Sequence, residues 1–170
     1  MAKIIIKIPK GTYSNADAIN KLIGYIATDN HQPALIGGFG FFPITADSAI
    51  EEFNKIDSKM SKYSSCSRKV YHLIMALDNT FRMSQAVMFA NYIASTYASN
   101  GFFVFYGIHD PMNTKEHRGV HIHFCIQYYS YNCYRRNLSP DYFMDILEIC
   151  KHRMIQCMGY TFKTEVGNNA

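Results

Sequence analysis

The chain has 170 residues, 48% of them hydrophobic and 15% aromatic, so it can bury one core, and we expect a single domain over residues 1–170. No apolar run approaches the roughly 20 residues of a membrane span, and the N-terminus lacks the long apolar region of a signal peptide; we therefore expect a soluble, cytoplasmic protein without a membrane segment. Five cysteines without a CxxC pair favour free thiols, and a net charge of +4 is compatible with a polyanionic partner without indicating one.

The N-terminal part is predicted to contain a strand, a helix and a loop. A β-branched run at 4–8 predicts the strand. Apolar residues at helical spacing over 18–26 predict the helix, with Ser14 or Asn15 as its cap. Residues 31–45 contain three glycines and two prolines, which predicts a loop.

The middle of the chain is predicted to alternate between helix and strand. Asp47 or Ser48 can cap a second helix, and the apolar run 70–77 predicts a central strand. Ser84 then caps a third helix, whose apolar stripe continues until Gly101 stops it.

The last part is predicted to contain two strands and a long helix. The strands cover 102–108 and 120–128, with a polar loop between them. The helix is capped by Ser139, has a proline at its first position and stops at Gly159. Because the loop is too short for a helical crossover, the two strands should be antiparallel neighbours. The predicted fold class is α+β, with helices packed on one face of a mainly antiparallel central sheet.

Two histidines in the strand at 120–128 share one face. Residues in a strand alternate, so His121 and His123 point to the same side as Cys125 and Gln127. Their Cα atoms are about 6.5–7 Å apart along a strand, which allows both imidazoles to bind one ion at about 2.0–2.1 Å. The pair therefore predicts a divalent metal site.

The third metal ligand is predicted to be His109. This residue ends the preceding strand, and antiparallel pairing brings that end beside the start of the histidine strand. His117 is the alternative third ligand, but it lies in the middle of the loop, where it is held less rigidly. Three protein ligands leave coordination positions open, which suggests catalysis.

The order of several short motifs resembles the HUH endonucleases, and within them the MOBP-like plasmid relaxases, which start plasmid mobilisation. The resemblance spans most of the chain. The segments that carry it are 22–26 (Leu-Ile-Gly-Tyr-Ile), 37–38 (Gly-Gly), 69–76 (Lys-Val-Tyr-His-Leu-Ile-Met-Ala), 106–109 (Tyr-Gly-Ile-His) and 121–124 (His-Ile-His-Phe). The tyrosine precedes the histidine strand, as in relaxases.

The resemblance implies an enzyme that nicks and transfers single-stranded DNA. In that family a tyrosine of the first motif attacks the scissile phosphate and three histidines bind the metal, which transfers these roles to Tyr25 and to His109, His121 and His123. The implied cofactor is Mg²⁺ or Mn²⁺, with Zn²⁺, Co²⁺ or Ni²⁺ as substitutes, and the implied partners are single-stranded or hairpin DNA at an origin of transfer and accessory mobilisation proteins. Because a tyrosine has a pKa near 10, a neighbour must help it ionise, and His72 is a candidate.

A DNA-binding surface is predicted from cations and aromatic rings near these motifs. Positive charge binds the phosphate backbone, and aromatic rings stack on bases. The residues expected to contribute are Arg68, Lys69, Arg118, Tyr129, Arg135 and Arg136.

Two alternatives remain open. Single-strand transposases and rolling-circle initiators use the same metal strand with a later tyrosine, which would be Tyr142 or Tyr160. A non-catalytic DNA-binding metal domain is the second alternative, because the family usually has an aspartate where Pro111 stands and often an asparagine at the position of Gln127.

Overall fold

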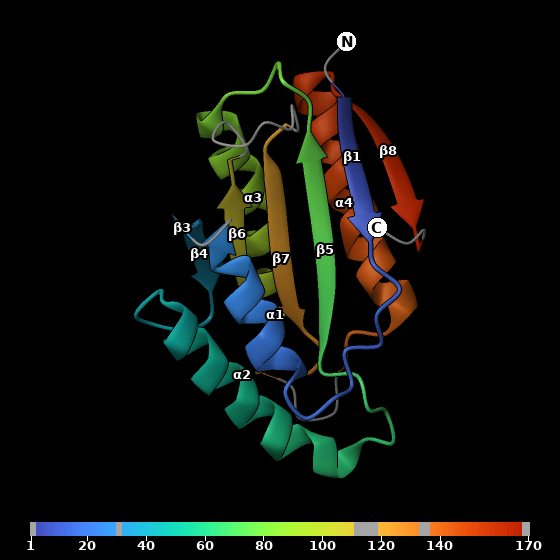
Figure 1. Cartoon of the computed structure of the whole chain (residues 1–170). Coiled ribbons are helices and arrows are strands. Elements are labelled where there is room, and N and C mark those ends of the chain that lie inside the picture. The colour runs from blue at the N-terminus through green and yellow to red at the C-terminus, as the bar shows by residue number, and fades with distance from the viewer. Residues whose placement is uncertain (1–2, 30–31, 111–118, 133–136, 168–170) are drawn as a thin grey trace.

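A six-stranded sheet in the order β4-β6-β7-β5-β1-β8 forms the centre of the computed structural model, which describes residues 3–29, 32–110, 119–132 and 137–167 (Figure 1). The strands are β1 (Lys3–Ile8), β4 (Leu35–Phe39), β5 (Val70–Leu77), β6 (Val104–His109), β7 (His121–Gln127) and β8 (Thr161–Val166). A separate small sheet pairs β2 (Thr28–Asp29) with β3 (Gln32–Pro33). The helices are α1 (Ala18–Ile26), α2 (Ala46–Met60), α3 (Met83–Ser99) and α4 (Pro140–Met158), with one turn of 3₁₀-helix, η1 (Ser61–Tyr63).

The α+β class is confirmed, but the sheet is mixed rather than mainly antiparallel. β4, β6, β7, β5 and β1 pair antiparallel with their neighbours, whereas β8 pairs parallel with β1. The sequence prediction did not include β8. This strand directly follows α4, which carries the chain back along the sheet so that β8 enters in the direction of β1. Parallel neighbours require such a crossover.

The predicted loop over 31–45 contains the edge strand β4. Glycine is disfavoured in strands and suggested a loop. In the structure, Gly37 pairs with Tyr106 of β6, and a Cβ atom on Gly37 would lie 2.2 Å from the Tyr106 hydroxyl oxygen. The glycine is needed because the tyrosine side chain crosses the strand at that point.

Helices cover both faces of the sheet, so the prediction of helices on one face was wrong. α3 and α4 pack on the face formed by alternate residues such as Leu73, Ile122 and Phe124. α1 and α2 pack on the opposite face, against Phe105 and Cys125. Figure 1 shows α1 in front of β7 and α4 behind β1 and β5. The polar face predicted for β7 is therefore partly enclosed, and the amide nitrogen of Gln127 donates to the carbonyl of Phe53 in α2.

Both predicted ends of α4 are confirmed, whereas the N-caps predicted for the other three helices are wrong. Ser139 caps α4, and Gly159 ends it in the left-handed conformation, as predicted. The N-cap positions of α1, α2 and α3 are Asp17, Thr45 and Arg82. These replace the predicted caps Ser14 or Asn15, Asp47 or Ser48, and Ser84. In α2, the Thr45 hydroxyl accepts from the backbone N–H of Ser48, so the predicted cap lies inside the first turn.

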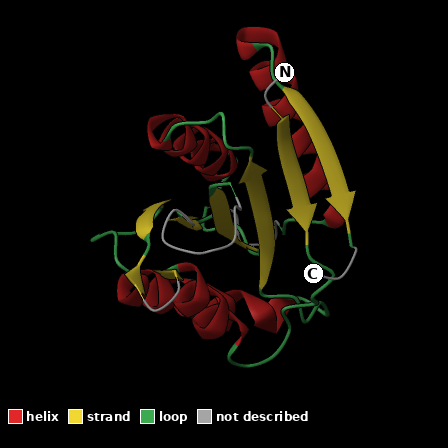
Figure 2. Cartoon of the chain, turned by 45° about the horizontal axis from the view of Figure 1, so that its top comes forward, coloured by secondary structure: helices red, strands yellow, loops and turns green. Residues whose placement is uncertain are grey.

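Half of the sheet carries no helix on the α1 side. α1 and α2 pack over β4, β6, β7 and the start of β5, and none of the residues they bury belongs to β1 or β8. In the described part of the chain, no helix lies in front of β1 and β8 on this side (Figures 1 and 2). Lys3 and Lys7 of β1 lie on this open face, where they line a hollow together with His121. No helix within the described ranges has both the length and the apolar composition needed to cross a membrane.

Candidate metal and tyrosine site

The sheet register brings the predicted histidines to one region. β6 and β7 pair His109 directly with His121, and β5 and β7 pair His72 with Cys125, two residues beyond His123. Alternation along the three strands places these histidines on the face that carries α1. The prediction that antiparallel pairing delivers His109 beside the start of the histidine strand is confirmed.

The ring of Tyr25 lies against three histidine rings. Its centroid is 5.3 Å from that of His123, 6.0 Å from that of His109 and 6.2 Å from that of His72. The His109 and His123 centroids are 4.5 Å apart, and those of His72 and His123 are 5.3 Å apart. We call these four residues the histidine–tyrosine cluster. The three imidazoles are buried, whereas Tyr25 is 54% exposed, so a solvent-borne molecule can reach its hydroxyl.

The close approach of α1 to the sheet holds Tyr25 in this place. The helix buries the apolar side that includes Ile23 and Ile26, and Tyr25 stands beside that side at the end of the helix. A Cβ atom on Gly107 of β6 would lie 2.1 Å from the Ile26 carbonyl oxygen. A glycine at this strand position lets the end of α1 touch the backbone of β6.

The carbonyl of Ile26 also orients His109. His109 Nε2 lies 2.9 Å from that oxygen, and a carbonyl can only accept, so Nε2 carries the proton. When the ring is neutral, the lone pair is then on Nδ1. This nitrogen lies 3.9 Å from the Asp29 carboxylate, too far for a hydrogen bond but close enough for both groups to bind one cation.

His72 and His123 belong to a hydrogen-bonded chain that starts at Tyr13. The Tyr13 hydroxyl lies 2.9 Å from His72 Nδ1, and His72 Nε2 lies 3.1 Å from His123 Nδ1. Burial, together with the nearby His109, lowers the pKa of His72 to about 4 and that of His123 to about 2. Both imidazoles are therefore neutral at pH 7, the form that binds metal ions. Both nitrogens of His72 are occupied by Tyr13 and His123.

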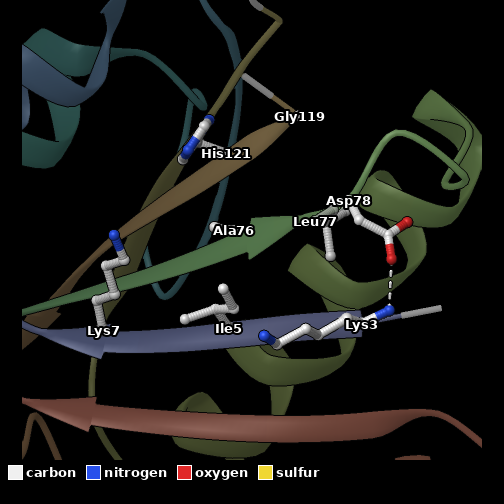
Figure 3. Close-up of a pocket in the computed structure, with 8 residues that line it drawn as sticks. All are labelled: Lys3, Ile5, Lys7, Ala76, Leu77, Asp78, Gly119 and His121. Atoms are coloured by element: carbon white, nitrogen blue, oxygen red, sulfur yellow. Dashed lines mark hydrogen bonds between the residues drawn. The ribbon is translucent and has the colours of Figure 1, made fainter. Parts of the chain in front are cut away.

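His121 lies at the edge of the cluster and lines an adjacent open hollow of about 570 Å³. Lys3 and Lys7 of β1 line the same hollow, with Ile5 between the two lysines and Ala76 of β5 between β1 and the histidine (Figure 3). The backbone N–H of Lys3 donates to Asp78 at one end. The hollow thus has an apolar floor and basic walls, beside the histidine–tyrosine cluster.

The donor types at the site fit a divalent cation. Within the described ranges, no three histidine, cysteine, aspartate or glutamate side chains are arranged so that they could hold a metal ion. The donor groups in this region are the imidazoles of His109, His121 and His123 and the carboxylate of Asp29. A mixed set of imidazole and carboxylate suits Mn²⁺ or Zn²⁺. The alternative ligand His117 lies outside the described residues.

Of the residues predicted to bind DNA, the structure describes Arg68, Lys69 and Tyr129, and each of these is engaged within the protein. Arg68 lies over the Tyr71 ring at 4.5 Å and donates to the Gly11 carbonyl. Lys69 forms a largely buried ion pair with Asp57. Tyr129 is only 3% exposed and donates to a backbone carbonyl, which argues against a role in base stacking. The remaining predicted residues, Arg118, Arg135 and Arg136, lie outside the described residues.

The alternative nucleophiles lie on the opposite face of the sheet from the histidines. Tyr142 packs against the core under α3 and α4 and donates to Asn100. Tyr160 packs against Phe81 and Phe89 in the same core. The sheet separates both hydroxyls from the histidine–tyrosine cluster.

Four residues of the site were missed by reasoning from the sequence. Tyr13 lies in a segment without a regular pattern, 59 residues before its partner His72. Lys3 and Lys7 are four residues apart in β1 and therefore share a face, and this spacing could have identified an open strand face. Asp29 follows the helix that carries Tyr25, and only the register of the sheet brings it to His109.

Comparisons of the chain with protein-family models, with curated proteins and with solved structures gave no match.

Proposed function

We propose that the protein is a metal-dependent strand transferase of single-stranded DNA, in which Tyr25 attacks a phosphodiester as in relaxases. The observation that carries the proposal is the placement of a half-exposed tyrosine ring within 6.2 Å of three histidine rings from three neighbouring strands. A nucleophile that solvent can reach, beside buried imidazoles, is the arrangement that this chemistry needs.

The reaction exchanges one phosphate ester for another. The hydroxyl oxygen of Tyr25 forms a bond to the phosphorus, and the bond between phosphorus and the 3′ oxygen of the preceding nucleotide breaks. Because Tyr25 is half exposed, its phenolic proton passes to solvent water, and the leaving 3′ oxygen takes up a proton from water. The products are a 5′-phosphotyrosine and a free 3′-hydroxyl. Because the ester bond is conserved, attack by a 3′-hydroxyl reverses the step without ATP.

The residues proposed to hold the cation are His109, His121 and His123, with Asp29 as a further donor. A bound divalent cation supplies positive charge that neutralises the phosphate and stabilises its transition state. His109 is oriented by the Ile26 carbonyl, and His123 by His72. Since both nitrogens of His72 are engaged, we assign it a positioning role rather than direct proton transfer from Tyr25.

The hollow beside His121 is the proposed path of the DNA backbone. Lys3 and Lys7 place two positive charges on its walls, and Ile5 and Ala76 form an apolar floor. Phosphates bind cationic side chains, and nucleobases pack on apolar surface. A strand lying in this hollow would continue toward Tyr25, which borders the same face of the sheet.

A denaturing gel tests the proposal directly. The full chain is incubated with hairpin and unstructured single-stranded oligonucleotides from candidate transfer origins, and with a randomised pool, in Mn²⁺ or Mg²⁺. We expect a covalent protein–DNA adduct that is absent with EDTA and absent for Tyr25→Phe. Tyr63→Phe is the matched control, because this tyrosine is 75% exposed and lies in η1. Mass spectrometry of the adduct should identify Tyr25.

The other outcomes point to the alternatives. An adduct that survives Tyr25→Phe but disappears with Tyr142→Phe or Tyr160→Phe would favour the transposase or initiator mechanism. Tight binding of oligonucleotides by the wild type without any adduct would favour a non-catalytic DNA-binding domain.

A further inference from the structure

Tyr13 is the outer member of the hydrogen-bonded chain that leads to His123. Its hydroxyl lies 2.9 Å from His72 Nδ1, and its ring meets the His72 ring edge-on at 5.9 Å. His72 Nε2 then lies 3.1 Å from His123 Nδ1. The chain connects a loop before α1 to two strands of the sheet and ends within the histidine–tyrosine cluster.

The loop that carries Tyr13 is held in a strained conformation. Tyr13 has a φ of +45°, which a bulky residue rarely adopts unless its surroundings impose it. The Tyr13 carbonyl accepts from the backbone N–H of Lys69, and the neighbouring Gly11 carbonyl accepts from Arg68. A Cβ atom on Gly11 would lie 2.7 Å from the Tyr13 ring. The fold therefore fixes the Tyr13 ring against His72.

A neutral imidazole has one N–H and one lone pair, so the chain has two possible directions. In one, Tyr13 donates to His72 Nδ1, His72 Nε2 donates to His123 Nδ1, and His123 carries its proton on Nε2. In the other, His123 donates from Nδ1 to His72, His72 donates to the Tyr13 oxygen, and His123 keeps a lone pair on Nε2. In the first direction Nε2 of His123 is a hydrogen-bond donor, and in the second it has a lone pair that can bind a cation.

The surroundings of His123 favour the second direction. His123 is buried, and among the residues that the structure describes no acceptor lies within hydrogen-bonding distance of Nε2. An N–H at Nε2 would therefore depend on water as its acceptor, whereas a lone pair there needs no partner, so the second direction makes fewer demands on the site. Tyr13 is only partly buried, so its hydroxyl can accept from His72 and still donate to water.

We propose that Tyr13, acting through His72, fixes His123 in the tautomer with its proton on Nδ1, and so leaves Nε2 free to bind a divalent cation. The cation-binding half of this proposal rests on the proposed function, whereas the tautomer does not. Tyr13 is thus a positioning residue that contacts neither the cation nor DNA.

Histidine tautomers in the metal-free full chain test the first half. Long-range proton–nitrogen NMR of histidine-labelled protein distinguishes Nδ1–H from Nε2–H, and we expect Nδ1–H for both His72 and His123. Tyr13→Phe keeps the ring and removes only the oxygen, so His72 loses its acceptor and the Nδ1–H populations of both histidines should fall. Tyr63→Phe should leave them unchanged. A proton on Nε2 of His123 in the wild type, or unchanged tautomers in folded Tyr13→Phe, would overturn the proposal.

Titration calorimetry with Mn²⁺ tests the second half. Loss of a hydrogen-bond partner behind a metal ligand typically lowers affinity by about 10–100-fold, and we expect a loss in this range for Tyr13→Phe and none for Tyr63→Phe. Equal affinities of Tyr13→Phe and wild type would overturn the coupling of tautomer to cation. If the wild type does not bind Mn²⁺, both the role of Nε2 in cation binding and the metal dependence of the proposed function are wrong. The NMR result would still decide which tautomer His123 adopts.

Discussion

His109 Nε2 donates to the carbonyl oxygen of Ile26 across 2.9 Å, which ties the last turn of α1 to the end of β6. This single contact relates the proposed nucleophile to the proposed metal site, because Tyr25 precedes Ile26 in the chain and His109 ends the strand. Any change that lifts α1 from β6 should therefore separate Tyr25 from the histidines and free the His109 ring to rotate.

Gly107→Ala is expected to move α1 away from β6. The new Cβ atom would lie 2.1 Å from the Ile26 carbonyl oxygen, which is backbone and cannot rotate away. We expect a loss of about 1–3 kcal/mol in the free energy of unfolding, typical of overpacking, together with a strong decrease in adduct formation. Urea denaturation and the adduct gel provide the two measurements.

Gly24→Ala, at an exposed position of α1, is the matched control. A Cβ atom on Gly24 meets nothing within 4 Å, and alanine is favoured over glycine in a helix by about 0.5–1 kcal/mol. This variant should be as stable as the wild type or slightly more stable, with adduct formation preserved. Equal stability of Gly107→Ala and Gly24→Ala would contradict the close approach of α1 to β6.

Two of the candidate tyrosines, Tyr25 and Tyr142, should separate stability from activity. The Tyr25 ring is half exposed, so Tyr25→Phe should change the free energy of unfolding by less than about 0.5 kcal/mol and abolish the adduct. Tyr142 donates to Asn100 at 2.8 Å, so Tyr142→Phe should cost about 1 kcal/mol and keep the adduct. Stability is measured by urea denaturation. The reverse pattern would place the chemistry on the α4 face.

Much of the histidine site was accessible from the sequence because its signals are local. Alternation in β7 and the short connection from β6 were sufficient to place His109 beside His121. The cap at Ser139 and the stop at Gly159 likewise depend on neighbouring residues only. The predictions for these parts needed no knowledge of distant contacts.

The parts that were missed depend on contacts between distant segments. Gly37 suggested a loop, because the sequence does not show that the Tyr106 side chain occupies the space of a Cβ atom at this position. Tyr129 lies in a stretch rich in tyrosine and polar residues, which suggested a surface position. In the structure it is buried, and its hydroxyl donates to the Cys66 carbonyl. Tyr13 acquires a role only through His72, on a strand far along the chain. Local patterns do not encode such pairings.

The basic hollow leads to a prediction on the salt dependence of DNA binding. Lys3→Ala and Lys7→Ala each remove one cation from its walls. Each should lower the affinity for single-stranded DNA and reduce the slope of log affinity against log salt by about 0.7, the value for one phosphate contact on a single strand. Fluorescence anisotropy at several salt concentrations measures both.

Arg153→Ala is the control for total charge. Arg153 is an exposed residue of α4, which covers the opposite face. Arg153→Ala also removes one positive charge, but we expect the slope of log affinity against log salt to stay unchanged. Equal effects of all three variants would show that DNA responds to net charge rather than to the hollow.

The stability of the metal-free protein should fall as the pH falls below about 6.5. Burial lowers the pKa of His72 to about 4 and that of His123 to about 2 in the folded state, from 6.5 in the unfolded chain. The unfolded chain therefore binds more protons in this window, and acid favours unfolding. Each histidine contributes a loss of up to roughly 1.4 kcal/mol per pH unit, fully developed about one unit below 6.5. Stability from this source is fully present above pH 6.5.

Urea denaturation in EDTA between pH 4.5 and 7.5 measures this dependence. His123→Gln should flatten the slope by about one proton, because glutamine does not titrate, whereas His152→Gln on the exposed side of α4 should leave it unchanged. A slope that is the same in wild type and in His123→Gln would mean that His123 is protonated in the folded chain. A charged His123 would repel a divalent cation, so the same experiment bears on the proposed metal site.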